Sequence, residues 1–253
     1  MKTSRPPRSL AIDIENDVVN KSIVEKIESF ELPKTGFNFI DEHFGFKRKQ
    51  MHLICSTSGA GKSTLVRSII MNLIERDAKV LIISTEETLE DYKYKLIKGK
   101  CMADFVTRNL RFIEERNIFE TEKYEEILLP EFFNGLDEVL GAIPEIDIVV
   151  YDNITTSPWY TDINIAMPFV NGIYRAMKTV NASLICVAHT SSNIRQSEIE
   201  ITPECVRGSK TIGLRAEYFY FLRSLETLTG NRRNIIEVKK ARAFGEMSRF
   251  ELN

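Results

Sequence analysis

The hydrophobic pattern of this chain consists of short, continuous apolar runs that alternate with longer amphipathic segments. Such runs, bounded by polar turns, are typical of strands buried on both faces of a parallel sheet, and the amphipathic segments between them predict helices. The expected strands are 51–55, 80–84, 110–113, 146–152 and 183–188, and the expected helices are 65–76, 89–100, 132–143 and 163–180. Pro168 lies inside the last helix and predicts a kink or a late start. This alternation predicts an α/β fold with a central, mostly parallel sheet flanked by helices.

The two ends of the chain follow other patterns. Residues 1–16 are polar and interrupted by proline, which predicts an extended or disordered tail. Apolar residues at helical spacing predict a short linker helix over 17–30, with a stripe too narrow to be stable alone. Near the C-terminus we expect strands at about 217–222, 235–239 and 248–252, with a hairpin around 229–231. The predicted division is a tail and linker over 1–34 and one large domain over 35–253.

The segment LICSTSGAGKST, residues 53–64, carries the clearest chemical signal. It follows a predicted strand and precedes a predicted helix, which is the context of a phosphate-binding loop. Glycines allow backbone N–H groups to converge on an anion, and the helix N-terminus adds partial positive charge. Lys62 would reach the β/γ-phosphates and the Ser63 hydroxyl would ligate Mg²⁺, although Ser56 replaces the usual first glycine. The predicted nucleotide-binding residues are Ser58, Gly59, Ala60, Gly61, Lys62, Ser63 and Thr64.

Three polar residues follow predicted strands at the edge of the sheet where ligands of open α/β folds bind. Glu86 stands just after the strand 80–84, although an acid in this segment has the alternative role of capping the next helix. Asp152 ends the strand 146–152, the position of the carboxylate that holds Mg²⁺ through water in phosphate-loop enzymes. His189 ends the strand 183–188 and is placed to donate a hydrogen bond to a γ-phosphate.

Composition narrows the class of protein. Hydrophobic residues make up 43% and charged residues 28%, ordinary values for a globular protein, and the net charge of −2 argues against a protein coated in positive charge. No apolar run is long enough to span a membrane, and no secretory signal is evident. Cys55 and Cys186 lie in apolar runs, which favours buried, reduced thiols in a reducing cytosol. We therefore expect a cytoplasmic protein of a bacterium or a phage-infected cell.

Several ordered motifs resemble the RecA-like ATPase module of DnaB-type replicative DNA helicases, and most closely the helicase half of phage primase-helicases and Twinkle. The resemblance runs from about residue 35 to the C-terminus. It is carried by SGAGKSTLVRS, STEET, IVVYD, VAHTSSN, VRGSKTIGLRAEYFYFLRS and VKKARAFGE. Lys210 stands where this family usually has glycine.

The resemblance assigns roles to individual residues. It implies that Glu86 orients or deprotonates the attacking water and that His189 senses the γ-phosphate, in a site with Lys62 and Asp152. It places Arg223 near the nucleotide base. It also implies that Lys240 and Arg242 reach the γ-phosphate held by the adjacent subunit.

The same resemblance implies an ATP-dependent 5′ to 3′ DNA helicase, with ATP or another NTP or dNTP and Mg²⁺ as ligands. A site completed by a neighbour requires an oligomer, so we expect a ring or open helical hexamer, held partly by the linker helix. Single-stranded DNA would thread the centre and contact Arg195, Arg207 and Lys210. No primase domain is recognised, so a primase or loader would be a separate chain. The alternatives are a RecA-like recombination or annealing ATPase, and a regulatory ATPase of the RadA and KaiC kind that does not unwind DNA.

Overall fold

The computed structural model describes residues 31–41, 46–99, 102–118, 127–191, 201–226, 232–242 and 248–252. The chain divides into two units, Met1–Glu31 and Leu32–Asn253, and the fold described below belongs to the second unit. The predicted tail and linker helix lie outside the described residues.

The described residues form one eight-stranded sheet in the order β3-β2-β4-β5-β1-β6-β7-β8. The first six strands in this order are parallel, and β7 and β8 are antiparallel to their neighbours. The strands are β1 (Met51–Ser56), β2 (Val80–Ser84), β3 (Leu110–Glu114), β4 (Ile148–Asp152), β5 (Ser183–His189), β6 (Tyr218–Glu226), β7 (Arg232–Ala241) and β8 (Ser248–Leu252). The prediction of a central, mostly parallel sheet is confirmed, and β6 and β7 pair as the predicted hairpin.

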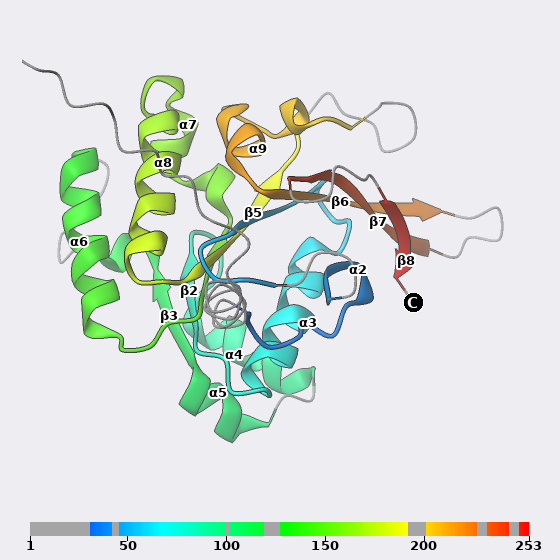
Figure 1. The fold of residues 1–253 in the computed structure, drawn as a ribbon, viewed down its shortest axis with the longest axis horizontal. Helices are drawn as coiled ribbons and strands as arrows, with labels where there is room; N and C mark the ends of the chain where they lie inside the picture. Colours follow the sequence, from blue (N-terminus) through cyan, green and yellow to red (C-terminus); the bar gives the residue numbers. More distant parts are fainter. Residues whose placement is uncertain are drawn as a thin grey trace, which may run out of the picture. The chain divides into compact units, whose positions relative to one another are not determined.

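Helices cover both faces of the sheet (Figure 1). On one face lie α2 (Asn38–Asp41), α3 (Lys62–Ile74), α4 (Leu89–Lys98) and α5 (Ala103–Asn109). On the other face lie α6 (Leu129–Ala142), α7 (Pro158–Thr161), α8 (Ile163–Thr179) and α9 (Thr211–Arg215). Single turns of 3₁₀-helix, η1 (Glu115–Ile118), η3 (Ile154–Thr156) and η4 (Pro203–Cys205), complete the connections.

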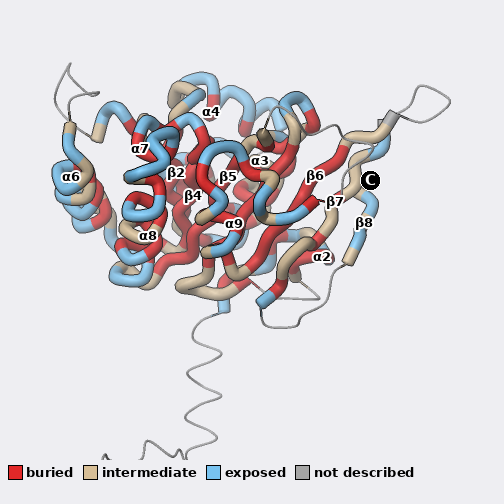
Figure 2. The backbone as a smooth tube through the Cα atoms, turned by 90° about the horizontal axis from the view of Figure 1, so that it is seen from above, coloured by how far each residue is buried: buried red, intermediate tan, exposed pale blue. Residues whose placement is uncertain are grey.

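The strand side chains alternate between two apolar cores, one on each face of the sheet. Leu53 and Cys55 pack in the core under α6 and α8, whereas Ile54 packs in the core under α3. This alternation explains why the strands read as continuous apolar runs, because each face of the sheet is covered by helices. Figure 2 shows the buried strands between helices whose outer faces are exposed.

Some boundaries differ from the sequence-based expectation. Helix α8 begins at Ile163, where the side chain of Asp162 accepts a hydrogen bond from Asn164 N, so a late start after Pro168 is wrong. Strand β4 begins at Ile148, two residues later than expected, because Asp147 accepts a hydrogen bond from Lys79 N and pairs with Arg48 at the turn before it. Among the described residues, no helix combines the length and the apolar character that crossing a membrane would require.

Candidate functional site

The phosphate-binding motif forms the turn between β1 and α3. Gly59 and Gly61 have φ angles of 76° and 92°, in the left-handed region that favours glycine. Nothing lies within 4 Å of where a Cβ would stand on either residue, so the backbone conformation accounts for these glycines. Helix α3 then begins at Lys62, which puts its N-terminal N–H groups beside the loop. This geometry suits an anion such as a phosphate group.

Lys62 and Asp152 are two charged side chains buried beside each other at this edge. Each residue is only 6% exposed. Burial raises the pKa of Asp152 to about 6, and the Lys62 charge opposes this rise. A buried carboxylate with a raised pKa is a common feature of functional sites.

The same carboxylate tests whether a magnesium ion suits the site. The Oδ1 atom of Asp152 is buried and has no hydrogen-bond partner among the described residues. Carboxylate and hydroxyl oxygens, together with substrate phosphates and water, are the ligands that Mg²⁺ prefers. Asp152 and the nearby Ser63 therefore fit the ion in chemical type. The described residues hold no cluster of three metal-binding side chains, as expected for a cation held largely by phosphate oxygens.

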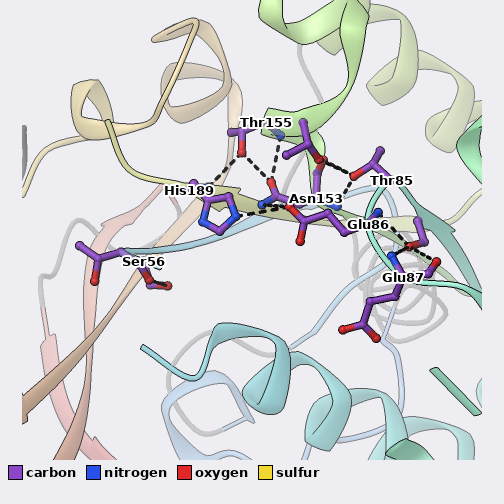
Figure 3. Close-up of polar contacts among 10 residues, drawn as sticks. Ser56, Thr85, Glu86, Glu87, Asn153, Thr155 and His189 are labelled. Carbon is purple, nitrogen blue, oxygen red and sulfur yellow. Dashed lines mark hydrogen bonds and ion pairs between the residues drawn. The ribbon is translucent and has the colours of Figure 1, made fainter. Parts of the chain in front are cut away.

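Glu86 and His189 meet across the carboxyl ends of β2 and β5. His189 Nε2 lies 3.4 Å from Glu86 Oε1 (Figure 3). The hydrogen bond to His189 is the largest cause that lowers the pKa of Glu86, and its burial acts against this effect. Glu86 is therefore ionised at neutral pH while its side chain stays 38% exposed. An ionised carboxylate open to solvent has the properties of a group that orients or deprotonates water.

Asn153 connects these two residues, and the sequence analysis missed it. Its Nδ2 donates to Glu86 Oε1 at 3.3 Å, and its Oδ1 accepts from Thr155 N and Thr155 Oγ1 at 3.0 and 2.7 Å. Thr155 Oγ1 in turn accepts from His189 N at 3.1 Å. Thr85 Oγ1 completes the network, accepting from Asn153 N and donating to Asn153 O, both at 2.9 Å. The signal in the sequence was an asparagine and threonines directly after strands that end at this edge.

A hollow of about 290 Å³ opens beside Glu86, at the carboxyl ends of β2 and β3. Glu86, Glu87 and Glu114 line it, with Thr156 and Pro158 from the segment after β4. This volume is several times the roughly 30 Å³ of one water molecule. Water therefore has room next to the Glu86 carboxylate.

Arg223, the predicted contact of the nucleotide base, lies just beyond the carboxyl end of β1 on the neighbouring strand β6. Leu222 pairs with Ser56 at the end of β1, so Arg223 is on the same edge as the phosphate loop. Its guanidinium Nε lies 3.1 Å from Glu237 Oε2, and its side chain is only 10% exposed. Burial alone would raise the pKa of Glu237, but its contacts with Lys239 and Arg223 lower it.

Lys240 and Arg242 lie at the opposite end of the sheet. Tyr218 pairs with His52 near the start of β1 and with Ala241 at the end of β7, and Arg242 follows directly. Four residues of strand separate Tyr218 from Leu222, which is about 13 Å. Arg242 is therefore not brought together with the phosphate loop of its own chain. Lys240 Nζ donates to Gly213 O and Leu214 O at the end of α9, at 3.1 and 2.6 Å.

The proposed DNA-contacting residues are only partly described. Arg195 lies outside the described residues. Arg207 and Lys210 are both exposed, and Lys210 Nζ lies 2.9 Å from Glu204 Oε2. Arg207 N donates to His189 O at 2.8 Å, so this loop is attached directly to the strand that ends at the candidate site.

Comparisons with known proteins agree with this geometry. A protein-family model described as "ATPase: KaiC" matches residues 33–249. A solved structure whose title describes an "ATPase Domain" is similar with a TM-score of 0.70 at 16% sequence identity, with 95% of each chain covered. At this identity the likeness shows the fold, which is RecA-like. Solved chains that match number 726, so the fold alone does not single out a function. No curated protein matches the sequence.

Proposed function

This chain belongs to the KaiC-type ATPase family, and we propose that it is an ATP-driven motor that moves along single-stranded DNA and unwinds duplex DNA. The family and the RecA-like fold make it an ATPase domain that binds nucleotide. The proposal adds DNA as the partner, a 5′ to 3′ direction and the assignment of the site residues.

Hydrolysis begins with in-line attack of water on the γ-phosphate. Glu86 is the group that orients this water or takes its proton, since it is ionised and lies beside a hollow with room for water. Lys62 offsets charge on the β/γ-phosphates held by the loop 58–64. His189 contacts Glu86 and donates to the γ-phosphate when it is present. Arg223 lies at the same edge and contacts the base.

Ser63 and Asp152 are the residues that would hold magnesium, Asp152 through water. The ion, when bound there, would offset the negative charge that builds up on the phosphate oxygens. The unpartnered oxygen of Asp152 among the described residues supports this role. Lys62 is close enough to Asp152 to counter part of the cost of burying its charge.

Arg242 acts in trans, on the triphosphate held by a neighbouring subunit. Its position at the far end of β6 from its own phosphate loop supports this assignment. An arginine supplied in this way contributes on the order of 10³-fold or more to hydrolysis in related phosphoryl-transfer enzymes. The motor is therefore an oligomer, which we take to be a hexameric ring or an open helix. Lys240, two residues earlier, supports the same end of the strand.

The contact between Arg207 N and His189 O carries the DNA part of the proposal. A backbone hydrogen bond ties the exposed Arg207–Lys210 loop to the residue proposed to sense the γ-phosphate. A shift of His189 after hydrolysis would move this loop and its cations along a phosphate backbone. Backbone contacts are independent of DNA sequence and weaken with salt, as a translocating motor requires. A primase or loader, if used, is a separate cytoplasmic partner.

The test combines hydrolysis and strand displacement. We expect single-stranded DNA to stimulate ATP hydrolysis and the protein to displace one strand of a forked duplex with a free 5′ tail. The Lys62→Ala variant is the matched control and should lose both activities. Hydrolysis without stimulation by any DNA, together with intact forks, would contradict the proposal.

The family match also favours a second candidate, a regulatory ATPase that does not unwind DNA. Autophosphorylation in the presence of ATP, with no response to DNA, would support it. Strand annealing or exchange without unwinding would instead indicate a recombination ATPase.

A further inference from the structure

The surroundings of Arg242 show how its position is fixed. Its backbone N donates to Glu217 O at 3.0 Å, which holds the end of β7 against the start of β6. Its side chain is 57% exposed, and Nη1 lies 3.7 Å from Glu217 Oε1. Most of the guanidinium thus remains open to a ligand from outside the chain.

Glu217 is itself held rigidly. Its Oε2 accepts from Met51 N at 2.8 Å, and its Oε1 accepts from Tyr174 OH at 2.6 Å. Its backbone N also donates to Met51 O at 2.9 Å. The carboxylate is 16% exposed and is tied to β1, at the centre of the sheet, and to helix α8. Neither of its oxygens can move far without breaking a hydrogen bond.

Tyr174 adds further positive charge to this corner of the molecule. The Arg215 guanidinium carbon lies 4.3 Å and Lys178 Nζ lies 4.4 Å from the centre of its ring. Together with Arg242, three cations therefore gather around the Tyr174–Glu217 pair, here called the amino-edge cluster. Glu217 is the acidic member of this cluster, and its charge faces Arg242.

We propose that Glu217 is the positioning residue of the trans-acting arginine: its carboxylate, fixed by Met51 N and Tyr174 OH, holds the Arg242 guanidinium at the face presented to the neighbouring nucleotide. This inference rests on the proposed function. A flexible arginine would otherwise be ordered only on meeting the phosphate, at a cost in side-chain entropy. A displacement of about 1 Å in such a group can lower the rate by as much as 100-fold.

Mixed oligomers test this role because they separate the two halves of a shared site. Lys62→Ala copies can donate only Arg242, and Arg242→Ala copies can donate only the phosphate loop. Mixing them should restore hydrolysis at sites formed between unlike copies. If Glu217→Gln is added to the Lys62→Ala copies, we expect restored hydrolysis to fall roughly tenfold. If it is added to the Arg242→Ala copies, restored hydrolysis should stay unchanged.

A structural role would give a different result, because Glu217 also contacts the start of β1. Equal loss with Glu217→Gln in either copy, or no loss in either, would overturn the inference. Tyr174→Phe provides a second variant that keeps the ring and removes one bond to Glu217, and it should show the same dependence on placement with a smaller effect. Glu251→Gln, which removes an exposed ion pair with Arg233 on the same sheet, is the matched control and should have no effect.

Failure of the proposed function would appear differently. If the parent mixture of Lys62→Ala and Arg242→Ala copies forms stable mixed oligomers by sedimentation but recovers no hydrolysis, the shared site itself is refuted. If the parent mixture recovers and only the placement of Glu217→Gln makes no difference, the shared site stands and the role of Glu217 is refuted.

Discussion

His189 Nε2 and Glu86 Oε1 lie 3.4 Å apart at the carboxyl edge of the sheet. Two strands that are not adjacent, β2 and β5, bring these side chains together on either side of β4. The contact gives the group proposed to sense the γ-phosphate direct influence over the group proposed to act on water. The pKa of Glu86 is lowered mainly by this partner.

Glu86→Gln should lower the rate of ATP hydrolysis by roughly 100-fold or more, because an amide cannot accept the proton of the attacking water. Nucleotide affinity should change little, since the phosphate loop is unaltered. Steady-state hydrolysis and equilibrium binding of a fluorescent nucleotide measure the two quantities. Glu87→Gln is the matched control, because Glu87 pairs with Arg67 and Lys95 instead. An equal loss of hydrolysis in both variants would remove the special role of Glu86.

His189→Ala should shift the acidic limb of the hydrolysis pH profile to higher pH. His189 lowers the pKa of Glu86, so its removal raises that pKa toward the usual range of a glutamate. Glu86 must be ionised to act as a base, and a higher pKa means that activity is lost at a higher pH. The profile of kcat/KM against pH is the measurement. A limb that stays in place would show that Glu86 does not set it.

Sequence patterns located this edge of the sheet because parallel strands end on the same side. The run VLIIS predicted strand limits that the structure reproduces at Val80–Ser84, and Glu86 follows within two residues. The role of Asn153 was not predictable, since it depends on partners from three separate segments. Likewise, nothing local to Lys240 signals that its amine reaches the carbonyls that end α9.

Asp152→Asn should stabilise the nucleotide-free protein at pH 8 by up to about 3 kcal/mol, while abolishing magnesium-dependent hydrolysis. The folded-state pKa of Asp152 is raised from 3.8 to about 6, so folding is favoured when the group is protonated and this contribution is lost as pH rises through 6. The uncharged asparagine avoids that loss. The difference in free energy of unfolding between variant and wild type should shrink toward zero below pH 4. Urea denaturation at several pH values measures it, and a difference independent of pH would contradict the assignment.

His52 should make the fold sensitive to acid. It is buried between Phe46 and Tyr218, its Nδ1 lies 3.2 Å from Tyr220 OH, and burial lowers its pKa from 6.5 to about 3. The unfolded chain then binds a proton that the folded chain does not, so stability falls as pH drops below 6.5. The expected loss is about 1.4 kcal/mol per pH unit, or about 2 kcal/mol at pH 5.

The comparison for His52 is His52→Gln, which removes the titrating group. Its free energy of unfolding should start lower at pH 7.5, because ring stacking is lost, but should decline less between pH 6.5 and 5. Parallel slopes for the two proteins over this range would show that another group causes the acid sensitivity.

The central claim is that the triphosphate lies between two copies of the chain, bound by the phosphate loop of one and contacted by the arginine of the next. A structure of the protein with a non-hydrolysable ATP analogue and a single-stranded oligonucleotide tests it most directly. The account predicts an oligomer in which Arg242 of one subunit lies within hydrogen-bond distance of the γ-phosphate on the Gly59–Thr64 loop of its neighbour. Arg242 remote from every nucleotide in a fully liganded oligomer would contradict it.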